Sequence, residues 1–278
     1  RDNGLDYTPK QVSVGTGGKQ ILYNALMATV NEGDEVIISA PYWVSYPDIV
    51  LLCEGVPVIV TCGQEQSFKL TAAGLAGAIT PRTRWVILNS PSNPSGAAYT
   101  EKEIRQLAEV LKENPHVLVM ADDIYEHLVY DDFRFFTPAQ IGGDLAERVL
   151  TCNGMSKAYC MTGWRMGYIL SANSALMEQV TKLQYYITAC STDAMQYGVL
   201  AAIEQAPDYP SEMRDAFRQR RDLICARLNP IPGVSCHVPE GAFYVFPKVN
   251  VPGWSSVDIA LEILKEGVVC SPGSAFGT

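Results

Sequence analysis

A chain of 278 residues, 47% of them hydrophobic, can bury a large core and is long enough for one large domain and part of another. Its formal net charge of −9 excludes nucleic acid and anionic membranes as the main partner, because both attract an excess of Lys and Arg. The three histidines, His116, His127 and His237, do not stand at metal-ligand spacing, so no metal site is predicted.

The eight cysteines are scattered, and no two of them form a Cys-x-x-Cys motif. Such thiols are typical of a reduced, cytoplasmic protein. The chain contains no apolar run long enough to span a bilayer and does not begin with a signal sequence, so we expect it to be soluble. It starts at Arg1 rather than at a methionine and stops at Thr278 without a closing helix, so we also expect a fragment.

The first predicted elements are a strand at residues 12–14, a glycine loop and a helix at residues 19–30. Gly15, Gly17 and Gly18 would let an anion approach the N–H groups at the start of the helix, which is a geometry that binds phosphate. The pattern matches neither the dinucleotide-binding fingerprint nor the P-loop. A tight turn without a ligand explains the glycines equally well.

Strands and helices then alternate, which predicts an α/β fold with a largely parallel sheet. Trp43 follows the strand at residues 35–39 and either stacks on a flat ligand or covers the core. The next predicted elements are helix 45–54, strand 56–62, helix 71–79, strand 85–88, a helix opened by a capping box at Thr100 and Glu103, and strand 116–121.

Two of these strands end in polar residues. Strand 85–88 leads into a segment with two prolines, which restrict the backbone and hold the amide of Asn93 in place. Strand 116–121 leads into Asp122 and Asp123, and adjacent carboxylates at the end of an apolar strand need a cation. Groups at the carboxyl ends of parallel strands are placed for a ligand. An ordinary turn at Asn93 and two acids that cap a turn are the alternatives.

A lysine and an arginine lie between two further apolar strands, at residues 148–151 and 168–170. A buried ammonium at Lys157 is costly unless it is paired or converted, for example into a Schiff base with an aldehyde. Arg165 is a fixed cation that suits a phosphate. An aldehyde with a phosphate indicates pyridoxal phosphate, with one of the two adjacent acids at its ring nitrogen and Tyr125 within reach of its phenolic oxygen. The alternative is a lysine that reaches solvent and an arginine in a structural ion pair.

The last part of the chain predicts a helix at residues 211–228 and a strand at residues 242–246, where the side chains alternate. We therefore expect residues 1–208 to form a large cofactor-binding domain with a mixed, mainly parallel sheet flanked by helices. Residues 209–278 are expected to form a connecting helix and part of a smaller α/β domain.

Five motifs together resemble the class I aminotransferases, which depend on pyridoxal phosphate. They are Gly17-Gly-Lys19, Pro41-Tyr-Trp43, Asn93-Pro-Ser-Gly96, Asp122-Asp-Ile-Tyr125, and Ser156-Lys157 with Arg165-Met-Gly167. Their order and spacing are most similar to those of the bacterial aspartate aminotransferase subgroup, and the resemblance covers the whole chain. It implies the type I fold of pyridoxal-phosphate-dependent transferases and a homodimer.

The resemblance also implies a role for each matched residue. Lys157 matches the Schiff-base lysine, Asp122 the partner of the ring nitrogen, and Tyr125 and Asn93 the donors to the phenolic oxygen. Trp43 matches the ring that stacks on the cofactor. The residues that match the phosphate site are Gly17, Gly18, Lys19, Ser156 and Arg165. The residues that match the substrate pocket are Lys19, which holds a distal carboxylate, Trp43, Asn93 and Phe243.

The chain departs from its relatives in several places. Many relatives have a serine at Gly154, and the stretch 185–192, which in relatives reaches the partner subunit's substrate, differs here. Relatives also continue before Arg1, with a tyrosine for the neighbouring subunit's phosphate, and after Thr278, with an arginine for the substrate's α-carboxylate.

The expected reaction is a ping-pong transfer of an amino group between an L-amino acid, best aspartate, and a 2-oxo acid, best 2-oxoglutarate. Two alternatives remain open at this point. One is a pyridoxal-phosphate-dependent carbon-sulfur β-lyase on the same fold. The other is a non-catalytic, aminotransferase-like domain that binds an effector.

Overall fold

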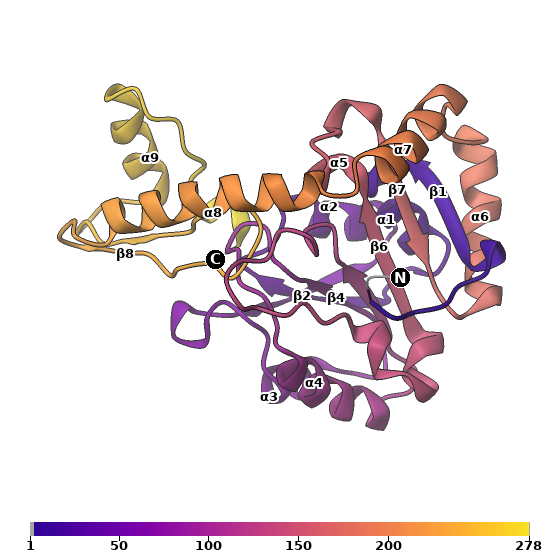
Figure 1. Ribbon diagram of the computed structural model, residues 1–278. Helices are drawn as coiled ribbons and strands as arrows, with labels where there is room; N and C mark the ends of the chain where they lie inside the picture. Colours follow the sequence, from indigo (N-terminus) through magenta and orange to yellow (C-terminus); the bar gives the residue numbers. More distant parts are fainter. Residues whose placement is uncertain (1–2, 278) are drawn as a thin grey trace.

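The computed structural model describes residues 3–277, and Figure 1 shows a sheet with helices packed around it. The sheet has seven strands in the order β1-β7-β6-β5-β4-β2-β3. β7 runs antiparallel to its neighbours β1 and β6, and the pairs from β6 to β3 are parallel. These strands are β1 Val12–Thr16, β2 Glu35–Ala40, β3 Val56–Thr61, β4 Thr83–Asn89, β5 Leu118–Asp122, β6 Val149–Gly154 and β7 Met166–Leu170. The prediction of a mixed, mainly parallel sheet is confirmed.

The helices are α1 Gly18–Met27, α2 Ser45–Leu52, α3 Ala72–Ala78, α4 Glu101–Glu113, α5 Met155–Ala158, α6 Ser174–Thr188, α7 Asp193–Gln205, α8 Tyr209–Leu228 and α9 Ser256–Lys265. Helices are present where the sequence predicted them, near residues 19–30, 45–54, 71–79, after Thr100 and at 211–228, and α5, α6, α7 and α9 are further helices that were not predicted. At the start of α4 the predicted capping box is present, because Thr100 Oγ1 accepts from Glu103 N–H at 3.3 Å and Glu103 Oε2 accepts from Thr100 N–H at 2.8 Å.

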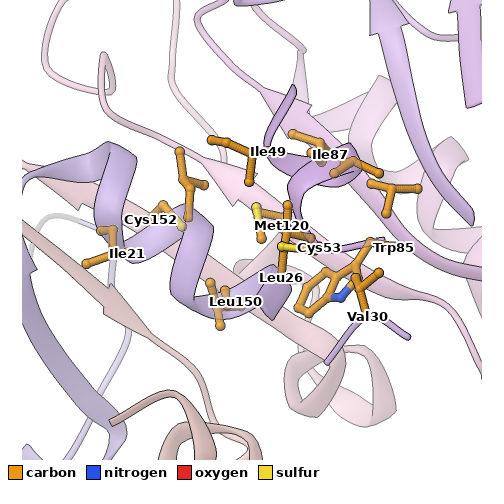
Figure 2. Close-up of a cluster of buried hydrophobic side chains, with 14 of the residues drawn as sticks. Ile21, Leu26, Val30, Ile49, Cys53, Trp85, Ile87, Met120, Leu150 and Cys152 are labelled. Atoms are coloured by element: carbon orange, nitrogen blue, oxygen red, sulfur yellow. The ribbon is translucent and has the colours of Figure 1, made fainter. Parts of the chain in front are cut away.

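Strand β4 separates two hydrophobic cores, because alternate side chains of a strand point to opposite faces. Trp85 and Ile87 pack against α1, α2 and α6, whereas Val86 and Leu88 pack against α3 and α4. Figure 2 shows the first core, with Trp85 next to Val30. The indole N–H of Trp85 donates to Thr29 Oγ1 at 2.8 Å, which satisfies the buried polar atom of this ring.

The sheet register brings the ends of three parallel strands together. Asn89 at the end of β4 lies opposite Asp122 at the end of β5, and Asp122 lies opposite Cys152 in β6. The antiparallel β7 then places Gly167 opposite both Gly154 in β6 and Gly15 in β1.

Gly167 allows a close approach between two distant parts of the chain. A Cβ at this position would lie 2.6 Å from the backbone nitrogen of Gly18, which no real side chain tolerates. The glycine loop after β1 therefore packs directly against the segment that carries Lys157 and Arg165.

The predicted strand at residues 242–246 is wrong. Ala242 has a left-handed backbone with φ of 57°, which interrupts an extended conformation, and no strand forms there. The segment instead contacts the large sheet's connections, because Ala242 N–H donates to Leu128 O at 2.8 Å and Gly241 bridges to Val129. The alternating rings of Phe243 and Tyr244 pack against Tyr125 rather than across a sheet.

Helix α8 leads away from the seven-stranded sheet toward the last elements, as Figure 1 shows. These are α9 and a two-stranded antiparallel sheet of β8 Val234–Ser235 and β9 Lys248–Val249. Among residues 3–277, no helix combines the length and the apolar character needed to cross a membrane.

Candidate active site

A cavity of about 200 Å³ lies at the carboxyl ends of β4, β5 and β6, next to the start of α1. This is the edge of a parallel sheet where ligands usually bind. Its walls are formed by Gly18, Lys19, Leu22, Trp43, Tyr46, Asn89, Asn93, Asp122, Ile124, Tyr125, Cys152, Asn153, Ser156, Lys157, Thr162 and Arg165. Of the residues that the resemblance assigned to the cofactor or the substrate, Gly17 and Phe243 are not part of these walls but adjoin them.

Lys157 lies in α5, a single helical turn that follows directly after β6, rather than in an irregular connection. Its side chain is half-buried, and Nζ lies 5.9 Å from the ring centroid of Tyr125 and 5.5 Å from that of Phe243. Burial lowers the pKa of the Lys157 amine, and the charge of Arg165 lowers it further, while Asp122 opposes both. The amine is therefore more readily uncharged than an ordinary lysine.

Asp122 is the acid that faces the cavity. Its Oδ2 accepts a hydrogen bond of 2.5 Å from the hydroxyl of Tyr46, and its Oδ1 accepts a longer one of 3.4 Å from Ile124 N–H. Burial raises the pKa of Asp122, whereas the hydrogen bond from Tyr46 and the amine of Lys157 lower it.

Asp123 does not take part in the cavity. It packs near Thr137 and Glu126, and its Oδ2 has no hydrogen-bond partner among the described residues. Burial, and then the charge of Glu126, raise the pKa of the Asp123 carboxyl well above its usual range. The strand alternation thus separates the two adjacent acids, and Asp122 alone faces Lys157.

Tyr125 and Asn93 meet through Tyr244. The hydroxyls of Tyr125 and Tyr244 lie 2.6 Å apart, and Asn93 Nδ2 donates to Tyr244 Oη at 3.3 Å. Asn93 is also held through its backbone N–H, which donates to Asn89 Oδ1 at 2.8 Å. Burial raises the pKa of Tyr125, so its hydroxyl remains protonated. Phe243 lies edge-on to Tyr125, with ring centroids 5.3 Å apart.

The other end of the cavity is cationic. Arg165 Nη1 donates to Thr162 O at 3.0 Å, which fixes the guanidinium beside the loop after β1. A Cβ on Gly17 would lie 2.3 Å from Arg165 Nη2, so the absence of a side chain there lets the cation reach the start of α1. The first N–H groups of a helix attract anions, and Ser156 adds a buried hydroxyl to the same cavity.

Trp43 and Lys19 form the side of the cavity that the sequence assigned to a flat ring and a carboxylate. Lys19 Nζ lies 5.1 Å from the centroid of the Trp43 ring. The same ring meets Tyr46 edge-on, with centroids 5.2 Å apart and an interplanar angle of 86°. Trp43 lies in the loop before α2 and Tyr46 in the first turn of α2, and Tyr46 N–H donates to Trp43 O at 3.0 Å.

Sequence reasoning missed two tyrosines that contact the predicted residues. Tyr46 stands three residues after Trp43, at the second position of the helix predicted for residues 45–54, so its nearness to Trp43 could be inferred from the sequence. Tyr244 is separated from Tyr125 by 119 residues, and no local pattern marks that contact.

These donor sets fit pyridoxal phosphate. Lys157 offers an amine for the aldehyde, and Asp122 offers a buried carboxylate for the ring nitrogen. Arg165 and the start of α1 offer charge and N–H groups for the phosphate, at the position where a side chain on Gly17 would block the approach.

Comparisons with known proteins agree with this chemistry. The family model described as aminotransferase class I and II matches residues 1–278. The aspartate/prephenate aminotransferase of Cereibacter sphaeroides is 54% identical, over all of this chain and 72% of its own length. The aspartate aminotransferase of Rhizobium meliloti is 49% identical, over all of this chain and 70% of its own length.

Solved structures give the same result. The aspartate aminotransferase from Rhizobium meliloti superposes with a TM-score of 0.95 at 48% identity, covering 100% of this chain and 72% of that one. The Thermus thermophilus aspartate aminotransferase with maleate gives a TM-score of 0.93 at 36% identity, covering 99% and 71%. The protein has the type I fold of these transferases. It belongs to the class I and II aminotransferase family and is a pyridoxal-phosphate-dependent transaminase of amino acids and 2-oxo acids.

Proposed function

We propose that this enzyme transfers the amino group of L-aspartate to a 2-oxo acid, best 2-oxoglutarate. The names of the relatives in Cereibacter and Rhizobium support aspartate as the donor. The main structural support is the position of the Lys19 ammonium, which lies over the face of the Trp43 ring. Lys19 lines the same cavity as Lys157 and Asp122. A dicarboxylic amino acid needs such a second cation for its distal carboxylate.

Lys157 acts as the base. Bound pyridoxal phosphate supplies an aldehyde that links to the amino acid and a ring that withdraws electrons from its Cα. Lys157 Nζ, whose pKa burial lowers, would accept the proton from Cα of the bound amino acid and would release it again within the site, because an uncharged amine is the form that accepts protons.

The remaining polar residues hold the ring in place for this proton transfer. Asp122 accepts a hydrogen bond from the ring nitrogen and keeps a proton on it. Tyr125 and Asn93 would donate to the phenolic oxygen, and Phe243 adjoins the cavity beside Lys157. Trp43, on the wall of the cavity, would supply the flat face for the ring.

The phosphate lies at the cationic end. We assign it to the guanidinium of Arg165, the hydroxyl of Ser156, and the backbone N–H groups of Gly18 and Lys19. Gly17, whose own N–H donates to Gly15 O at 2.8 Å, would border the phosphate without a side chain. The support for this assignment is the position of Arg165 against Gly17 at the start of α1, where helix N–H groups have no partner within the helix.

We propose further that the protein is a cytoplasmic homodimer. All eight cysteines are free thiols, as in a reducing compartment. Helices α6 and α7 expose several large apolar side chains that suit a contact between two copies, namely Tyr185, Tyr186, Tyr197, Leu200 and Ile203.

The two sheets support a division into two domains. The seven-stranded sheet ends at Leu170, and β8 and β9 form a separate sheet beyond α8. We therefore propose that residues 1–208 form the cofactor-binding domain and that residues 209–278 form the connecting helix and part of the small domain.

The test uses the purified holoenzyme. Addition of L-aspartate should change the visible spectrum of the bound cofactor, and subsequent 2-oxoglutarate should restore it with release of glutamate. Lys19→Met should raise KM for aspartate far more than KM for alanine, because alanine lacks the distal carboxylate. An unchanged spectrum with aspartate would refute the donor assignment, and pyruvate with ammonia from cysteine-like substrates, without amino transfer, would indicate a β-lyase.

Prephenate is a second candidate acceptor, because the name of the Cereibacter relative includes it. Prephenate is itself a 2-oxo acid with a second carboxylate, so Lys19 would serve it in the same way. Turnover of the amino form of the enzyme with prephenate, compared with 2-oxoglutarate at equal concentration, separates the two acceptors.

A further inference from the structure

Tyr46 is a buried tyrosine in the first turn of α2, and its exposed fraction is 3%. Its hydroxyl donates to Asp122 Oδ2 at 2.5 Å, across 76 residues of sequence. Hydrogen bonds from a hydroxyl to a carboxylate at this distance are short and strong. The contact lies at the wall of the cavity, beside Trp43.

We propose that Tyr46 is a positioning residue, which keeps Asp122 ionised and fixes the rotation of its carboxylate against the ring nitrogen of the cofactor. The proposal rests on the role given above to Asp122. It adds a residue of this chain that acts on the cofactor only through another side chain.

The electrostatics of the contact explain why Asp122 needs this donor. Burial raises the pKa of Asp122, so a carboxyl in this place tends to take up a proton and lose its attraction for a protonated ring. The hydrogen bond from Tyr46 is the largest influence that opposes burial. Lys157 also opposes the effect of burial on the pKa of Asp122, but only while its amine is charged. The function of Lys157 as a base requires the uncharged amine.

Tyr46 is suited to this task because it remains a donor. Burial and the neighbouring Asp122 raise the pKa of Tyr46 well above its usual range, so the hydroxyl keeps its proton at every working pH. A histidine or lysine in the same place would change its charge with pH. A neutral donor stabilises the carboxylate without adding a titrating group to the site.

The ring of Tyr46 has a separate structural function that the test must leave intact. It packs in the core below α2 and meets Trp43 edge-on. Tyr46→Phe removes the hydroxyl and keeps the ring, so it isolates the hydrogen bond to Asp122. Tyr99→Phe is the matched control, because Tyr99 is another buried tyrosine whose hydroxyl accepts from Leu70 N–H at 2.7 Å away from the cavity.

The experiment measures the affinity of the cofactor-free protein for two compounds by fluorescence titration. One is pyridoxal phosphate, and the other is its 1-deaza analogue, in which a C–H group replaces the ring nitrogen. Tyr46→Phe should weaken binding of pyridoxal phosphate by about tenfold or more and leave binding of the analogue nearly unchanged. Tyr99→Phe should change neither affinity. Equal losses for both compounds, or no loss for either, would overturn the role of Tyr46.

Asp122→Asn separates this proposal from the assignment of Asp122 itself. If Asp122 faces the ring nitrogen, this variant loses the preference for pyridoxal phosphate over the analogue. Should Asp122→Asn keep the preference, the role of Asp122 fails. If Asp122→Asn loses the preference for pyridoxal phosphate over the analogue but Tyr46→Phe retains it in full, only the role of Tyr46 is wrong. As a second readout, the acid limb of the pH profile of kcat/KM should move to higher pH in Tyr46→Phe, because the pKa of Asp122 rises.

Discussion

Substitution of Gly17 by alanine tests the geometry of the phosphate end. Gly17 has φ of 85° and ψ of 163°, a backbone region that only glycine adopts readily, and a side chain there costs about 1–3 kcal/mol of folding free energy. The new Cβ would also lie 2.3 Å from Nη2 and 2.7 Å from Cζ of Arg165. The guanidinium must therefore retreat by more than about 1 Å to reach an ordinary contact distance.

The displacement of Arg165 sets the expected loss of affinity. A hydrogen bond between charged groups contributes about 1.5–3 kcal/mol, which corresponds to a loss of about tenfold to a hundredfold in the affinity for pyridoxal phosphate. Equilibrium dialysis of the cofactor-free variant measures this loss, and chemical denaturation measures the strain separately.

Gly33→Ala is the matched control for backbone strain. Gly33 has φ of 82°, and a Cβ there would meet no heavy atom within 4 Å. It should lose stability without losing affinity for the cofactor. If Gly17→Ala and Gly33→Ala bind pyridoxal phosphate equally well, the close contact between Gly17 and Arg165 has no part in phosphate binding and the reasoning fails.

Four further outcomes follow from the same structure. Lys157→Ala should lose the visible absorbance of the covalent link, and borohydride followed by dialysis should leave it without cofactor; retained cofactor would refute the role of Lys157. Asp122→Ala should keep some cofactor but lose most turnover, so full turnover would contradict its assignment. The rate at which an anhydride labels Lys157 in the cofactor-free protein can be followed by mass spectrometry. It should reach half its maximum below pH 10.5, because burial lowers the pKa of this amine. A midpoint at or above pH 10.5 would show that the amine is not desolvated. Thr100→Ala should cost about 1 kcal/mol in denaturation experiments, since it removes the cap of α4, and an unchanged midpoint would mean that the capping box adds no stability.

Local patterns were sufficient for most of the fold. The spacing of apolar residues identifies β4 as a strand and α4 as a helix, the latter through Ile104, Leu107 and Leu111. Both elements were therefore predictable without knowing what they pack against. The segment at residues 242–246 has an alternation of the same kind, but a left-handed backbone at Ala242 and aromatic packing against Tyr125 override it. A short alternating pattern does not decide between a strand and a loop that packs its rings.

For the site, the sequence alone determined the chemical groups, because an amine, a carboxylate and a cation at strand ends and glycine loops have few other uses. Without the family resemblance, the residues did not determine which of the two adjacent acids faces Lys157, since that depends on the directions in which the side chains at the end of β5 point. The sequence also did not bring Arg165 to Gly17 or Tyr46 to Asp122. The first contact exists because β7 runs antiparallel between β6 and β1, and the second because the first turn of α2 places Tyr46 at the end of β5. Only the folded sheet brings residues so far apart in the chain into contact.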